Sequence, residues 1–119
     1  MTFVVRLSGG TCTYWEEHMT SIAENRDRLT YWVEFIKRRI TPGFKVTGPH
    51  SNNADVWYAI GSASAHNPAE VIPRVQLGVQ MRDARFFYCR PGGHRTVLST
   101  DVAALQVGAL RELTKLGML

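Results

Sequence analysis

The amino-acid sequence predicts an α+β fold in which one long N-terminal helix and one C-terminal helix pack on one face of a mostly antiparallel sheet of about four to five strands. Apolar residues recur at steps of three and four over residues 13–43 and again over residues 100–117, which is the spacing of a helix face. Between these segments, apolar or alternating runs are separated by glycine, proline and asparagine, as in strands joined by turns. The 119 residues suit a single domain.

The long helix is expected over residues 14–40. The hydroxyl of Thr13 is suited to cap its first turn, and Pro42 with Gly43 should stop it. The polar run 25–28 interrupts the apolar stripe, so we expect a bend there and prefer one bent helix to two separate helices. The stripe consists of Trp15, Met19, Ile22, Leu29, Val33, Ile36 and Ile40.

Three aromatic residues, Tyr31, Trp32 and Phe35, lie beside this stripe and widen its apolar surface. They either pack under the sheet or form a face for a protein partner, and the sequence leaves both interpretations open. A homodimer built as a coiled coil is compatible with the spacing, but Arg26 at a seam position disfavours it. The sequence therefore does not fix the oligomeric state.

The strands begin before the long helix, where residues 2–7 alternate and predict a strand that a Ser-Gly-Gly turn joins to the helix. After the helix we expect a short edge strand at 44–46 and a mobile polar loop over 48–55. Residues 56–60 are apolar on both faces, which is typical of a central strand.

The second half of the sheet should be a meander. Residues 67–70 carry the pattern of a short helix start, and Pro73 would end that helix. Strict alternation over 75–81 predicts the clearest strand of the chain. Turns then lead to 86–89 and to 95–98, so these three strands should pair antiparallel.

The last helix is expected over residues 100–117. Thr100 is suited to cap it, and the carboxylate of Asp101 favours the positive end of its dipole. The apolar stripe of this helix consists of Val102, Leu105, Ala109, Leu113 and Leu116.

Composition argues against several classes of protein. No apolar stretch approaches the roughly 20 residues that span a bilayer, and the first residues do not form a secretory signal, so we expect a cytoplasmic protein without membrane contact. Cys12 and Cys89 are too few for a disulfide framework or a structural zinc site. The four histidines show no ligand spacing, so we expect neither a metal nor another cofactor.

An enzyme is the least favoured of three functional hypotheses. Cys12 or Cys89 could pair with a loop histidine as nucleophile and base. However, the sequence contains no Gly-x-Ser-x-Gly elbow and no phosphate-binding loop. We therefore expect no catalytic residues. The loop histidines are His50, His66 and His94.

Positive charge gathers in the middle of the chain and supports a second hypothesis. The net charge is +4, and the arginines of the meander have three aromatic residues between them. Arginine grips phosphates and flat rings stack on bases, so this mixture suits single-stranded nucleic acid. The plainer interpretation is a sheet edged by arginine with a buried aromatic face. The basic residues are Arg74, Arg82, Arg85, Arg90 and Arg95, with His94 nearby, and the aromatic residues are Phe86, Phe87 and Tyr88.

The leading hypothesis is a small binding or regulatory protein that acts through protein–protein contacts. It follows from the missing catalytic motif and from more aromatic residues than one core requires. A small, mildly basic domain of this kind fits the profile of phage or mobile-element proteins that inhibit a host nucleic-acid-handling machine, such as anti-CRISPR proteins. The partner-binding candidates are Arg74, Arg82, Arg85, Arg90, His94, Arg95, Tyr31, Trp32 and Phe35.

Overall fold

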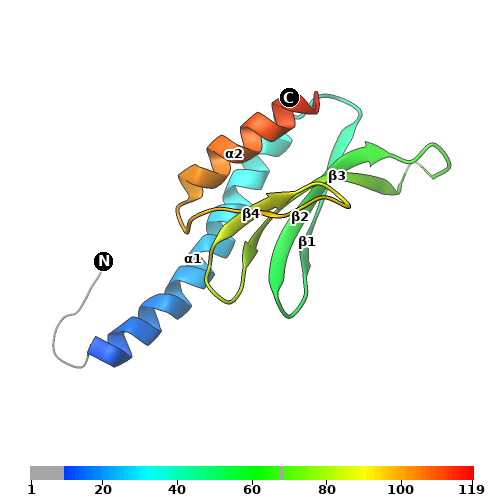
Figure 1. Cartoon of the computed structure of the whole chain (residues 1–119). Helices are drawn as coiled ribbons and strands as arrows, with labels where there is room; N and C mark the ends of the chain where they lie inside the picture. The colour runs from blue at the N-terminus through cyan, green and yellow to red at the C-terminus, as the bar shows by residue number, and fades with distance from the viewer. Residues whose placement is uncertain (1–9, 68) are drawn as a thin grey trace.

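The predicted fold class is confirmed: the described part of the chain forms one antiparallel five-stranded sheet with two helices (Figure 1). The computed structural model describes residues 10–67 and 69–119, with side chains described from residue 22 onward. The predicted strand 2–7 lies outside these residues. In chain order the elements are α1 (Gly10–Lys37), β1 (Phe44–Ser51), β2 (Asp55–Ala63), β3 (Val71–Gln80), β4 (Phe86–Cys89), β5 (Thr96–Val97) and α2 (Val102–Lys115).

The sheet is a simple meander in which each strand pairs antiparallel with the next one along the chain. Tyr58 of β2 faces Leu77 of β3, which in turn faces Tyr88 of β4. Because side chains alternate along a strand, these residues and their second neighbours share one face of the sheet. We call the opposite face, which carries Asp55, Trp57, Gln76, Gly78, Gln80, Phe87 and Cys89, the open face.

The hydrophobic core lies between the first face and the two helices. The inward side chains come at steps of three and four on each helix, and their burial is what holds the helices to the sheet. None of the helices in the described part of the chain is long and apolar enough to cross a bilayer. The buried cluster contains Leu29, Trp32, Val33 and Ile36 from α1, Leu105, Ala109 and Leu113 from α2, and Tyr58, Ile60, Val75, Leu77, Val79 and Phe86 from the sheet.

The helices α1 and α2 run in the same direction, as the colours of Figure 1 show. Midway along α1 and just before the start of α2, the Nδ2 atom of Asn25 donates a hydrogen bond of 2.9 Å to the carbonyl oxygen of Thr100. Beyond their ends, the amide of Thr41 donates to the carbonyl oxygen of Met118 at 2.8 Å. The two helices are therefore in register along the length that they share.

The polar run 25–28 does not break α1, so the alternative of two helices is wrong. Asn25 is 1 % exposed and points inward. Its Nδ2 atom bonds the carbonyl oxygens of Ala84, at 2.8 Å, and of Thr100, and its Oδ1 atom accepts from Arg28 at 2.9 Å. The interruption of the apolar stripe is thus a buried polar contact with two distant segments. The helix already includes Gly10, so Thr13, the expected cap, lies inside it.

The prediction of a loop over 48–55 is wrong for residues 48–51, which belong to β1. The pairing of β1 with β2 shifts between Thr47 and His50 and then resumes. The Gly48–Pro49 peptide bond in this bulge is cis, and Gly48 has a φ of +127°. A Cβ atom there would lie 2.9 Å from the ring of Tyr58, so the position requires glycine. The turn signals therefore mark a bulge within a strand.

The short helix expected from residue 67 is also wrong. The side chain of Asn67 accepts from the amide of Ala69 at 3.1 Å, which makes a turn, and β3 begins at Val71. Pro73 lies inside β3, where the register against β2 shifts beside Gly61. The prediction failed because a cap residue followed by proline is typical of turns as well as of helix starts.

The remaining elements differ from expectation mainly at their ends. The strands expected at 56–60 and 75–81 are confirmed, and both begin earlier in the chain. The last strand contains only Thr96 and Val97. The N-cap of α2 is Asp101 instead of Thr100, because its side chain accepts from the amide of Ala103 at 2.9 Å.

Candidate functional site

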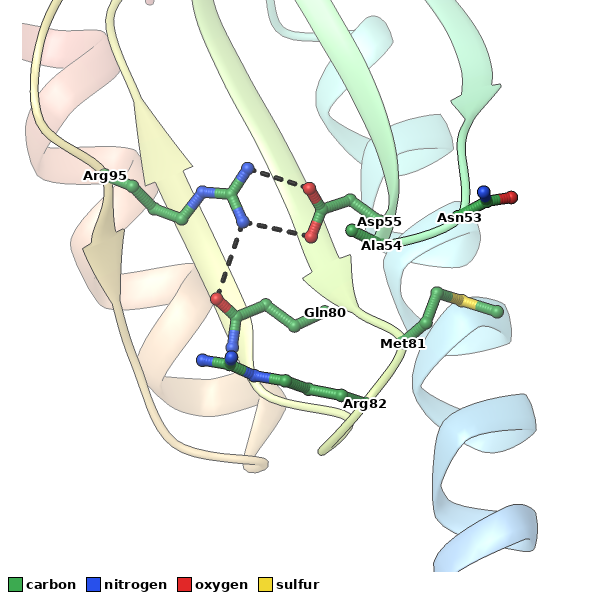
Figure 2. A pocket seen from close by; sticks show the side chains of 7 residues that line it. All are labelled: Asn53, Ala54, Asp55, Gln80, Met81, Arg82 and Arg95. Carbon is green, nitrogen blue, oxygen red and sulfur yellow. Dashed lines mark hydrogen bonds and ion pairs between the residues drawn. The ribbon is translucent and has the colours of Figure 1, made fainter.

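An ion-pair network occupies the open face of the sheet (Figure 2). The guanidinium group of Arg95 donates to both carboxylate oxygens of Asp55, at 3.0 and 2.9 Å, and more weakly to Gln80 at 3.5 Å. It also lies 3.8 Å above the centre of the Phe87 ring. The hydrogen bond to Asp55 raises the pKa of Arg95 further above its usual value, although burial opposes this. The contact holds the chain before β5 against β2 and β4.

Phe87 completes this arrangement by lying over Gly78 on the neighbouring strand. The two residues are register partners, and a Cβ atom on Gly78 would be 2.5 Å from the ring and 2.6 Å from the carbonyl oxygen of Val56. Phe87 is 1 % exposed as a result. The ring is therefore covered from above by Arg95 and supported from below by a glycine that leaves room for it.

A hollow of about 570 Å³ lies beside this network, and the charges of its lining balance. Figure 2 labels the residues that line it. Arg95 is neutralised by Asp55, and Arg82 lies 3.7 Å from Asp83. Burial acts to raise the pKa of Asp83, yet hydrogen bonds from Gln80 and Arg85 and the charges of Arg82 and Arg85 hold it below its usual value. The hollow therefore has little net attraction for an anion.

The remaining basic candidates are spread over the sheet. Arg74 occupies the bulge of β3, about 20 Å along the strand from its C-terminal end. Arg85 donates to the carbonyl oxygen of Leu98 at 2.6 Å, and Arg90 forms an ion pair with Glu112 of α2. These partners use much of the positive charge that the sequence concentrates in this region.

The aromatic run of the meander offers few rings for stacking on bases. Phe86 is fully buried in the core and Phe87 is buried beneath Arg95. Tyr88 is partly buried against the same core. Base stacking needs an exposed ring face, so the arginine and aromatic mixture is better explained by packing.

The hypothesis of a Cys/His pair receives no support from the surroundings of Cys89. Cys89 and His94 line one hollow together with Glu112. The thiol nevertheless donates to the side chain of Gln76 at 3.5 Å, and burial raises its pKa although the charge of Arg95 opposes the shift. A thiol that stays protonated is a poor nucleophile. Among the described residues, no group of three metal-ligating side chains is present.

The outer surface of the two helices carries a row of exposed apolar side chains. Tyr31 and Phe35 of α1 are 81 % and 43 % exposed, and Val107 and Leu110 of α2 are 58 % and 40 % exposed. We call these four residues the helix-layer patch. Trp32, the third aromatic candidate of α1, is 5 % exposed and belongs to the core.

The packing of the helices brings the two rows of the patch side by side. Tyr31 and Gln106 line one hollow, so these two positions lie beside each other. Because α1 and α2 are parallel, Phe35 and Leu110 occupy the corresponding positions one turn further on. The hollow measures about 310 Å³, has mainly apolar walls, and is lined by Asp27, Arg28, Tyr31, Trp32, Val102 and Gln106.

Basic side chains gather at the C-terminal ends of α1 and α2. The guanidinium group of Arg39 lies 3.6 Å above the ring of Phe35 and donates to its carbonyl oxygen. Arg38, Arg111 and Lys115 are exposed, and none of them forms an ion pair with a carboxylate in the described part of the chain. The C-terminal ends of the two helices are therefore cationic.

Sequence reasoning identified half of this surface. Tyr31 and Phe35 were candidates, whereas Val107 and Leu110 were not. Both residues of α2 fall outside its apolar stripe, and a large apolar residue on the wet face of an amphipathic helix is the signal that would have revealed them.

The sheet edges are poor alternatives for docking a partner. The outer edge of β1 is interrupted by the bulge at Gly48 and Pro49, and proline has no amide hydrogen to donate. At the other edge, β5 is two residues long. Short edges, bulges and prolines are the usual means by which a sheet avoids pairing with another chain.

No protein-family model, curated protein or solved structure matches this chain. The helix-layer patch is accordingly defined by geometry alone, as an exposed apolar row on two helices whose C-terminal ends are cationic.

Proposed function

We propose that this chain is a non-enzymatic binding protein that docks another protein on the helix-layer patch. One observation supports the proposal most directly: four apolar side chains are exposed on two helices that already bury other apolar side chains against the sheet. Contiguous exposed apolar surface of this kind is characteristic of interaction sites. Aromatic anchors such as Tyr31 dominate the energetics of many interfaces.

The narrower role expected from the sequence belongs to the same proposal. A regulatory protein from a phage or mobile element would inhibit a host nucleic-acid-handling machine by occupying one of its protein surfaces. The proposal also keeps the cytoplasm as the place of action. Direct binding of nucleic acid is less well supported, because Arg90 and Arg95 are paired with carboxylates and Phe86 and Phe87 are buried.

Site-specific photocrosslinking tests the proposal without knowledge of the partner. A benzophenone amino acid would replace Tyr31 in one variant and Ile72 in another, and each variant would be irradiated in its host cell. Ile72 is the matched control, because it is also a large apolar residue that is 49 % exposed but lies on β3. We expect a discrete protein adduct from position 31 that is missing from position 72.

The adduct must then be confirmed with purified components. The identified protein should bind the wild-type chain, and the double substitution Tyr31→Ala with Leu110→Ala should weaken binding by at least about tenfold. Ile72→Ala should leave the affinity unchanged. Identical adducts from both positions, or an affinity that does not respond to the double substitution, would refute the proposal.

A further inference from the structure

We infer that the partner segment is a short amphipathic helix with two apolar residues one turn apart and acidic residues at one end, lying along the groove between α1 and α2. This inference rests on the proposed function and specifies the partner for the same patch. It follows from the spacing of the groove, the backbone chemistry of its walls and the placement of charge.

The spacing of the apolar residues along the groove determines the spacing expected for apolar residues in the partner segment. Tyr31 and Phe35 are separated by one helical turn, and so are Gln106 and Leu110 on the facing helix. At about 1.5 Å per residue, four residues advance the groove by about 6 Å. Two apolar residues at positions i and i+4 of a helix advance by the same distance, so one can enter the hollow near Trp32 while the other contacts Phe35 and Leu110.

The walls of the groove favour a helix over an extended segment with a similar repeat. Both walls are helices, in which interior amides and carbonyl groups are already paired along the helix. An extended segment in the groove would find no backbone ladder to join and would leave its own polar backbone groups without partners. A helix satisfies these groups internally and presents only side chains.

The charge around the groove determines which end of the partner helix should carry the acidic residues. The cationic side chains at the C-terminal ends of α1 and α2 are Arg38, Arg39, Arg111 and Lys115, and Arg39 lies over the ring of Phe35. The nearby carboxylates are already engaged, since Glu34 pairs with Lys37 and Glu112 with Arg90.

The dipoles of the two helices reduce this positive potential but do not cancel it. Each helix C-terminus contributes about −0.5 charge, so the pair contributes about −1 against four cationic groups. The other end of the groove is closer to neutral, because Arg28 pairs with Glu24 at 3.9 Å and Asp27 lines the hollow. Acidic residues on the partner therefore belong beside the C-terminal ends of α1 and α2.

Designed peptides provide a direct test. Three synthetic helical peptides would be compared: one with two leucines four residues apart and a glutamate cluster at one end, one with lysines in place of the glutamates, and one with serines in place of the leucines. Fluorescence anisotropy would measure affinity, and amide NMR shifts would locate binding. We expect the Leu/Glu peptide to bind, with shifts confined to residues 27–39 and 102–115.

The control variants isolate the charge. Arg111→Glu should weaken binding of the Leu/Glu peptide by about tenfold, which is the effect of one unfavourable charge contact of about 1.4 kcal/mol. Arg74→Glu makes the same change of charge on β3 and should have no effect. The lysine and serine peptides should each bind at least about tenfold more weakly than the Leu/Glu peptide.

Several results would overturn the inference. Equal binding of the acidic and basic peptides, shifts on the open face of the sheet, or dimerisation of the chain through the patch in sedimentation would each contradict it. If crosslinking from position 31 identifies a partner that docks through a basic or extended segment, the inference fails while the proposed function stands. If neither the host protein nor the peptide contacts the patch, both fail.

Discussion

Replacement of Asn25 by alanine should destabilise the protein far more than its place in a polar run of α1 suggests. Asn25 joins three segments, because its Nδ2 atom bonds the carbonyl oxygens of Ala84 and Thr100 at 2.8 and 2.9 Å. Ala84 has a φ of +61° in the turn before β4, and Thr100 immediately precedes the N-cap of α2. Loss of the side chain would leave both carbonyl groups without this donor, and that of Ala84 lies in the interior, where water does not replace it.

The expected magnitude follows from these contacts. Each buried hydrogen bond contributes about 0.5–1.5 kcal/mol, and a buried group left unsatisfied adds to the loss. The removed amide also leaves a small cavity. We therefore expect the free energy of unfolding to fall by about 2–4 kcal/mol. For 119 residues, at about 2.1 cal/mol/K per residue, this corresponds to a fall in Tm of about 8–16 °C.

Urea denaturation followed by circular dichroism would measure the effect, with Glu24→Ala as the matched control. Glu24 is the neighbouring residue, and its half-exposed side chain forms an ion pair of 3.9 Å with Arg28. Removal of such a surface pair should cost no more than about 0.5 kcal/mol. If Asn25→Ala cost as little as the control, Asn25 would not join the helix layer to the β3–β4 turn, and the continuity of α1 through this run would need another explanation.

Three further substitutions test other parts of the fold. Gly78→Ala should lower the free energy of unfolding by about 1–3 kcal/mol in urea denaturation, because the new Cβ atom meets both the ring of Phe87 and a strand carbonyl; a neutral result would contradict this packing. The pKa of Cys89 is raised in the folded state, so stability should fall as pH rises above the usual thiol range, and Cys89→Ala should abolish that part of the fall in pH-dependent unfolding. The pKa of Asp83 is lowered, so its contribution should be complete above the usual carboxyl range and disappear as pH falls through the lowered value. Asp83→Asn should accordingly destabilise the protein at neutral pH and much less in acid, and an equal cost at both pH values would refute the assignment.

The sequence predicted the fold class because the strongest patterns belong to elements that bury one face. The stripe of Leu29, Val33 and Ile36 and the alternation over 75–81 both mark side chains that are buried in the folded chain. Helical spacing also located α2. These patterns depend on residues close together in the sequence, and the folded chain contains the elements that they predict.

The misplaced elements involve residues whose role depends on distant partners. Asn25 resembles a helix break until Ala84 and Thr100 supply its hydrogen bonds. Gly48 and Pro49 resemble a loop in the sequence, but β1 resumes its pairing with β2 after the bulge that they form. Local propensity cannot register such contacts, since they arise only when the sheet is assembled.

The candidate site was predicted in part for the same reason. Tyr31 and Phe35 were recognised as surplus aromatic residues, whereas the sequence could not show that Trp32 between them is buried. The arginines of the meander drew attention as a positive cluster. Their carboxylate partners, Asp55 and Glu112, are 40 and 22 residues away in sequence from Arg95 and Arg90, respectively.

The helix-layer patch is built from two helices that are separated along the chain by the entire sheet. Its two rows come together only after all five strands have been synthesised, because α2 follows the whole sheet along the chain. A chain still emerging from the ribosome would present the row of α1 without that of α2. A ligand that needs both rows would therefore bind only chains whose synthesis is complete. Its binding would also stabilise the folded state against global unfolding.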